Sequence, residues 1–211
     1  MRKHVLAISI CVLTAWSVGA YAQVRDVAIV PFGGYRWGGG LSSVKGIRDF
    51  DTQDTWSYGV AVDAGMAYNS AVEIYYSHFS GDVDAVLTTG EKLSGSLSRD
   101  DIMLNGIWYA TGGGQALRPY FTAGLGVSIY SAENVSATGR FAWNIGAGLR
   151  HDFNEKVGLR LDGRWLPTWL TTGSSVYCYP YSIYGCYAMD TGEFYDQFEL
   201  TGGLIIKLGG R

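Results

Sequence analysis

Hydrophobic alternation at a period of two residues restricts the fold of this chain more than any other feature. In residues 117–130 every odd position is apolar, and every even position holds a polar residue, a tyrosine or a glycine. A similar alternation runs through residues 141–153, 157–169 and 198–208. Successive side chains of a β-strand point to opposite faces, so this period indicates strands with one apolar and one polar face.

Four earlier segments, at residues 27–37, 56–66, 71–79 and 101–110, show the pattern less regularly. Each of the eight segments is about ten residues long, which is enough for a tilted strand to cross a bilayer. The connections alternate in length, as the periplasmic turns and outer loops of membrane barrels do. The short connections are residues 67–70, 111–116 and 154–156, and the long ones are residues 38–55, 80–98, 131–139 and 170–195.

The charges on the polar face decide between a soluble and a membrane barrel. A soluble barrel turns its apolar face inward and its polar face toward water. Here the polar face carries five cations and four anions at regular spacing, and the other face is rich in aromatic residues, a combination that does not fit the surface of a soluble barrel. We therefore expect lipid on the apolar face and the charges inside, near balance because unpaired buried charge is costly. The predicted interior network is Arg36, Asp63, Glu73, Arg150, Arg160, Asp162, Arg164, Glu199 and Lys207.

The tryptophans favour the same conclusion. Five of the seven fall toward one set of strand ends, whereas Trp108, with Tyr68, falls toward the other. Two such aromatic girdles mark the two membrane interfaces of a barrel. The sequence therefore predicts an all-β fold, an eight-stranded antiparallel transmembrane β-barrel. Its net charge of −3 argues against nucleic acid as a partner.

The N-terminus carries the features of a secretory signal peptide. A short basic region precedes an apolar run at residues 5–18, and the small residues Ala20 and Ala22 stand where a signal peptidase cleaves. We expect residues 1–22 to be removed after Ala22, and residues 23–211 to form one outer-membrane β-barrel domain.

The last long connection holds Cys178 and Cys186, the two cysteines that follow the predicted signal peptide. An exported pair favours a disulfide over two free thiols. A zinc site would need further ligands, and no histidine stands in this stretch. The stretch is also rich in tyrosines, which suit contact with an extracellular protein or glycan or, equally, packing on the barrel rim. These tyrosines are Tyr177, Tyr179, Tyr181, Tyr184 and Tyr187.

Residues 33–37, 118–127 and 142–149 resemble the outer-membrane β-barrel family that includes the membrane domain of outer membrane protein A and the opacity-type surface proteins. The resemblance covers nearly all of the chain after residue 22. It implies outer-membrane lipid as the environment and the barrel-assembly machinery as a partner. The C-terminal signal that this machinery reads is matched by Thr201, Gly203, Ile206 and Leu208. The usual terminal Phe of that signal is replaced by Leu208, and three residues follow it.

An eight-stranded barrel has an interior just wide enough for its own side chains. We therefore expect a plugged, monomeric barrel with a structural or surface-interaction role, without chemistry, cofactor or metal. A narrow, low-conductance pore is the alternative.

A more remote alternative is an outer-membrane hydrolase. His78-Phe79-Ser80 resembles the His-x-Ser pair of the lipid A deacylases, with Glu91 or Asp82 as the carboxylate that orients the histidine. Residues two apart on a strand share a face, so a strand can place the side chains of His78 and Ser80 on the same side.

Overall fold

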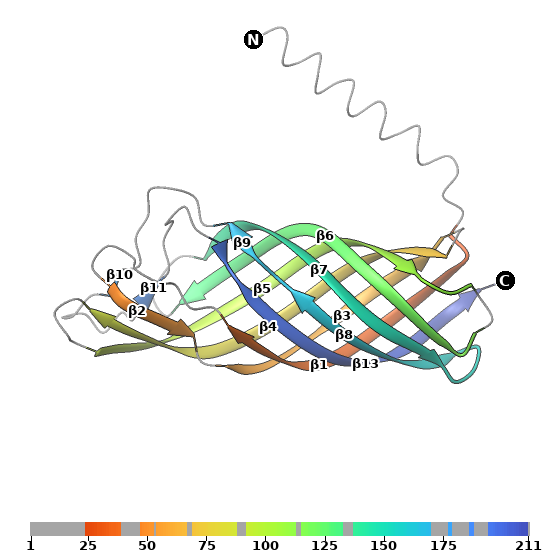
Figure 1. Ribbon diagram of the computed structural model, residues 1–211, viewed down its shortest axis with the longest axis horizontal. Coiled ribbons are helices and arrows are strands. Elements are labelled where there is room, and N and C mark those ends of the chain that lie inside the picture. The colour runs from red at the N-terminus through yellow and green to blue at the C-terminus, as the bar shows by residue number, and fades with distance from the viewer. Residues whose placement is uncertain are drawn as a thin grey trace, which may run out of the picture.

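The alternating segments pair edge to edge into a closed antiparallel β-barrel (Figure 1). The computed structural model describes residues 24–38, 47–52, 54–66, 69–87, 92–112, 115–132, 137–169, 177–178, 186–187 and 194–210. None of the described residues forms a helix long and apolar enough to cross a membrane. The predicted signal peptide lies outside the described residues. The strands of the wall are β1 (Asp26–Gly38), β3 (Thr55–Gly65), β4 (Ser70–Leu87), β5 (Lys92–Tyr109), β6 (Leu117–Ala132), β7 (Thr138–Asp152), β8 (Val157–Trp165) and β13 (Gln197–Gly210).

Each strand of the wall pairs with the next, and β13 returns to β1 to close the ring, which confirms the predicted eight-stranded barrel. The two faces also follow the prediction. On β6 the side chains of Phe121 and Leu125 are 64% and 61% exposed, whereas Tyr120 and Thr122 are both 2% exposed. The apolar face therefore points outward, toward lipid, and the polar face points inward.

The structure extends two strands beyond their predicted ends. Residues 80–98, predicted as a loop, contain a paired hairpin in which β4 and β5 stay in register to Val86 opposite Lys92. The short strand β2 (Ile47–Thr52), within the predicted loop 38–55, pairs with β4 along the same extension. A strand that leaves the bilayer has water on both faces, so it needs no apolar face and shows no alternation.

One predicted segment, residues 157–169, is interrupted at Pro167 because proline has no N–H for the ladder. The chain continues as β9 (Thr168–Trp169), which pairs with β12 (Phe194–Tyr195). Across the interruption the Trp143 amide donates to the Pro167 carbonyl at 3.2 Å. The wall is therefore still hydrogen-bonded to β7 at this point.

The two ends of the barrel differ in construction (Figure 1). The start of β1, the end of β13 and the strand ends joined by the short connections lie at one end, which is the periplasmic end in barrels of this construction. The opposite, outer end carries β2, the end of β4, the start of β5 and the paired strands β10 (Tyr177–Cys178) and β11 (Cys186–Tyr187). The outer end therefore has secondary structure of its own beyond the wall.

Candidate functional site

Side chains from seven of the eight strands of the wall meet inside the barrel as a buried network of ion pairs, and β6 adds Tyr120 and Ser128, which donate hydrogen bonds to carboxylates of the network. Inward positions recur every second residue, so β8 alone contributes Arg160, Asp162 and Arg164. Eight of the nine residues predicted for the interior network are buried, and Lys207 is half-buried near the periplasmic end of β13. The structure thus places the whole predicted set on the inner face.

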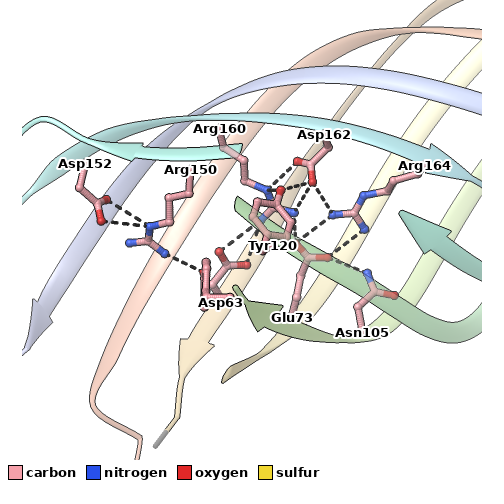
Figure 2. Close-up of polar contacts among 10 residues, drawn as sticks. Asp63, Glu73, Asn105, Tyr120, Arg150, Asp152, Arg160, Asp162 and Arg164 are labelled. Carbon is pink, nitrogen blue, oxygen red and sulfur yellow. Dashed lines mark hydrogen bonds and ion pairs between the residues drawn. The ribbon is translucent and has the colours of Figure 1, made fainter. Parts of the chain in front are cut away.

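Glu73 lies at the centre of a first group, the Glu73 cluster, which also contains Asp63, Asp162, Arg160 and Arg164 (Figure 2). Both guanidinium groups converge on the Glu73 carboxylate, Arg164 through Nη1 at 2.9 Å and Arg160 through Nη2. Arg160 also pairs with Asp162 at 2.6 Å and with Asp63 at 3.2 Å. Each arginine is therefore held by more than one carboxylate.

A second group, the Arg36 cluster, lies nearer the outer end and contains Arg36, Asp101, Glu199 and Arg99. Arg36 Nη1 pairs with Asp101 at 2.7 Å, and its Nη2 pairs with Glu199 at 2.9 Å. Arg99 Nε binds the other oxygen of Asp101 at 2.8 Å, and its Nη1 donates to Gln197 at 2.7 Å. All four charged side chains are at most 1% exposed, so this group is sealed from water.

Tyr75 joins the two clusters. Its hydroxyl donates to Glu199 at 2.6 Å, while the Arg164 guanidinium lies over its ring at 4.1 Å from the centroid. Phe32 also stacks on the Tyr75 ring, with centroids 4.8 Å apart. The interior is therefore occupied continuously from one charged group to the other.

A smaller group marks the periplasmic end of the network. Asp152 receives Arg150 Nε at 3.1 Å and Lys207 Nζ at 3.2 Å. Figure 2 shows this pair of Arg150 and Asp152 beside the Glu73 cluster. The side chains of Asp152 and Lys207, 20% and 17% exposed, are more exposed than those of the two clusters above, in agreement with their place at the barrel mouth.

The sequence prediction omitted three network residues: Arg99, Asp101 and Asp152. With them the paired interior holds equal numbers of opposite charges, which the desolvation cost of an unpaired buried ion requires. Arg99 lay between the predicted loop at residues 80–98 and the predicted strand at residues 101–110, and Asp101 was the first residue of that strand. The two-residue spacing of Asp101 from Met103 and Asn105, which are also buried, was the signal that placed it inside. The paired cations are Arg36, Arg99, Arg150, Arg160, Arg164 and Lys207, and the anions are Asp63, Glu73, Asp101, Asp152, Asp162 and Glu199.

Inward-facing glycines make room for these long side chains. A Cβ at Gly124 would lie 1.8 Å from the Asn105 amide oxygen, and one at Gly148 would lie 2.3 Å from the Tyr120 hydroxyl. Both neighbours serve the Glu73 cluster, since Asn105 donates to Glu73 at 2.6 Å and Tyr120 donates to Asp162. Glycine is therefore required at these positions by close approach.

The comparison with known families agrees with this architecture. The family described as the outer membrane protein beta-barrel domain matches residues 8–174, which is more than half of the chain. The chain belongs to this family. The resemblance inferred from the strand motifs is thereby confirmed, and this outer membrane β-barrel protein resides in the cell outer membrane.

Solved structures of other outer-membrane barrels share the fold. The outer membrane protein OprG from Pseudomonas aeruginosa is 13% identical, with a TM-score of 0.65 over 90% of this chain and 99% of that one. Neisserial surface protein A is 12% identical, with a TM-score of 0.58 over 89% of this chain and 99% of that one. None of the curated proteins matches the chain significantly. At these identities the likeness concerns the fold alone.

His78 lies on the outer face of the barrel, and its partner differs from those predicted. Its Nδ1 is 2.8 Å from Oδ1 of Asp100, the residue opposite it on β5, and Tyr76 donates to the same oxygen at 2.8 Å. The predicted carboxylates do not take this place: Asp82 lies four residues further along β4, and Glu91 is outside the described residues. Ser80, the predicted nucleophile, accepts a hydrogen bond from Ser98 at 3.2 Å.

The cysteines and tyrosines of the last outer connection are only partly described. The β10–β11 pairing sets Cys178 opposite Cys186 and Tyr177 opposite Tyr187. Tyr179, Tyr181 and Tyr184 lie outside the described residues.

In the predicted assembly signal, Thr201 and Gly203 face the interior, whereas Ile206 and Leu208 face outward at 39% and 61% exposure. The two hydrophobic positions of the signal therefore lie on the lipid-facing side of β13.

Proposed function

We propose that this outer membrane β-barrel protein is closed to solutes and acts at the cell surface, where its outer loops bind an extracellular protein or glycan without catalysing a reaction. The occupied interior is the observation that carries the proposal. Arg36, Glu73 and Arg164 are each at most 2% exposed although they lie in the bore of the barrel. Side chains that fill the bore leave function to the ends.

An ion path would require this network to open. Arg36, Arg160 and Arg164 are each held by a carboxylate from a strand that is not their neighbour, for example Arg36 of β1 by Asp101 of β5. Removing one partner of a buried pair typically costs about 3–5 kcal/mol, so spontaneous opening of several pairs together is rare. The charges therefore support a plug that holds the fold.

The outer end supplies a surface for contact. The β4–β5 hairpin extends beyond the predicted membrane strands, β2 pairs with it, and β11 approaches β5. Tyr177 on β10 and Tyr187 on β11 belong to the same end, and the other three tyrosines of the stretch stand between them in the sequence. Tyrosine offers a large contact area and a hydroxyl group at a small cost in conformational entropy, which suits recognition of protein and glycan surfaces.

Planar-bilayer recording separates the plugged barrel from the narrow pore. We expect the refolded protein to give no discrete current steps, because buried ion pairs fill its bore. Folding is verified in the same sample by a shift between unboiled and boiled gel bands. Discrete steps that Glu73→Gln alters would contradict the plug and support the pore.

Binding by the loop is tested with the folded barrel in lipid nanodiscs against glycan arrays and immobilised extracellular-matrix proteins. We expect bound signal from the natural protein and at least about a tenfold loss when the five tyrosines are changed together to serine, equivalent to about 1.4 kcal/mol. The control changes Leu41 and Val44, which belong to the connection predicted at residues 38–55, to serine. Equal binding by the tyrosine variant and the control variant would remove this loop from the proposal.

The predicted disulfide is supported by the β10–β11 register. Directly opposed residues of an antiparallel pair have Cα atoms about 4.5–5.5 Å apart, within the range that a disulfide spans. We expect Cys178 and Cys186 of the exported protein to resist alkylation until a reductant is added, and then to take up two alkyl groups per chain. The measurement is intact mass; alkylation without reductant would show free thiols.

A further inference from the structure

A polar cavity of about 190 Å³ opens at the periplasmic mouth of the barrel. It lies beneath the Glu73 cluster, among the end of β3, the start of β4 and the ends of β5, β6 and β7 that meet there. The volume is several times the share of one water molecule in the liquid, about 30 Å³, so it accommodates a small ligand with its hydration water. The charged residues lining it are Arg25, Asp26, Asp63, Arg118 and Arg150.

Two of these arginines face each other. Arg118 on β6 and Arg150 on β7 are directly opposed in register, and both line the cavity. Like charges directly opposite each other on adjacent strands destabilise a sheet. Such an arrangement calls for a compensating negative charge between or beside the two guanidinium groups.

Arg150 has that compensation from the protein, and Arg118 does not. Arg150 pairs with Asp152 at 3.1 Å and donates to the Tyr109 hydroxyl at 3.2 Å. Arg118 stacks over the Tyr109 ring at 3.9 Å from its centroid, and its buried Nε has no hydrogen-bond partner. Within the described residues no carboxylate forms an ion pair with Arg118.

The remaining carboxylates of the cavity do not neutralise Arg118. Asp63 is engaged by Arg160 at 3.2 Å. Asp26 is adjacent in sequence to Arg25, another cation of the cavity lining. Since the paired interior network is already balanced, Arg118 is a surplus cation at the edge of a polar cavity.

We propose that this cavity is a binding site for a small oxyanion, a carboxylate or phosphate group, taken from the periplasmic side and held chiefly by Arg118. Stacking on Tyr109 fixes the guanidinium plane, which leaves its N–H edges for two parallel hydrogen bonds to an oxyanion. Arg150 adds a second positive charge on the same side of the cavity. The bound anion relieves the repulsion between the two arginines.

The test uses the folded barrel in neutral detergent, with sodium phosphate, sodium acetate or sodium chloride at one constant ionic strength. Heating followed by gel electrophoresis gives the temperature at which the folded band is lost. A ligand that binds only the folded state raises this temperature. We expect phosphate, acetate or both to raise it by roughly 2–4 °C above the chloride value when the anion is in excess of its dissociation constant. A rise with phosphate alone identifies a phosphate group as the ligand chemistry, and a rise with acetate alone identifies a carboxylate.

The decisive comparison is between Arg118→Gln and Lys156→Gln. Lys156 is an exposed cation in the turn between β7 and β8, at the same end of the barrel but outside the cavity lining. We expect Arg118→Gln to abolish the anion-dependent rise and Lys156→Gln to retain it. In chloride, Arg118→Gln should unfold at or above the natural protein's temperature, because the opposed charge on Arg150 has gone.

Arg118→Lys keeps the positive charge but loses the forked pair of N–H donors of the guanidinium group. We expect this variant to bind the anion about tenfold more weakly. It also serves as the test variant if Arg118→Gln does not fold. Identical unfolding temperatures of the natural protein in all three salts would overturn the proposal. So would an equal loss of the anion effect in Lys156→Gln, which would show general screening of charge.

Discussion

Replacing Glu73 by alanine is expected to destabilise the folded barrel by about 3–5 kcal/mol. Glu73 is completely buried and accepts hydrogen bonds from both arginines of its cluster and from Asn105. Its removal leaves Arg164 with one ion pair, the longer one to Asp162 at 3.4 Å. A cation buried without its partner keeps its desolvation cost and loses the attraction that offset it.

Urea unfolding of the barrel in lipid vesicles, followed by tryptophan fluorescence and the gel shift, measures this free energy. Glu155→Ala is the matched control, since it removes a carboxylate from the exposed turn between β7 and β8 and should change the free energy by no more than about 0.5 kcal/mol. Glu73→Gln keeps hydrogen-bonding atoms while removing the charge, so its loss should be the smaller of the two Glu73 variants. A loss below about 1 kcal/mol in Glu73→Ala would contradict a tightly packed network.

The faces of the strands were predictable from the sequence, whereas the partners inside the barrel were not. Alternation assigned Phe121 to the lipid-facing side and Arg160 to the interior, because successive residues along a strand point in turn to the exposed and to the buried face. The pairing of Arg160 with Glu73, however, joins residues 87 apart in the sequence. It depends on how the strands are staggered around the barrel, which no local pattern records.

His78 illustrates the same limit. The sequence suggested carboxylates near it along the chain, but the register of β4 and β5 sets Asp100 directly opposite. The sequence did not reveal this register, because apolar and polar residues do not alternate in the hairpin beyond residue 80. Arg99 and Asp101 were missed for a related reason, since they lie where β5 enters the bilayer from that hairpin.

Placing a charge on the lipid face provides the second large effect: Leu104→Arg is expected to destabilise the barrel by about 2–4 kcal/mol. Leu104 is 60% exposed and lies on β5, four residues from Trp108 toward one end and four from Asp100 toward the other. Eight residues of a strand tilted by about 40° cover roughly 20 Å of height. Leu104 therefore lies near the middle of the apolar band.

Leu117→Arg is the matched control, because Leu117 is also lipid-facing, at 51% exposure, but lies at the periplasmic start of β6. An arginine near the interface extends its guanidinium into the headgroups, so we expect a cost of only about 0–1 kcal/mol. Both variants are measured by urea unfolding in the same vesicles as the natural protein. Because the two substitutions are chemically identical, a difference between them reports depth in the bilayer; equal costs would show that the apolar band does not lie where the outward-facing residues of β5 place it.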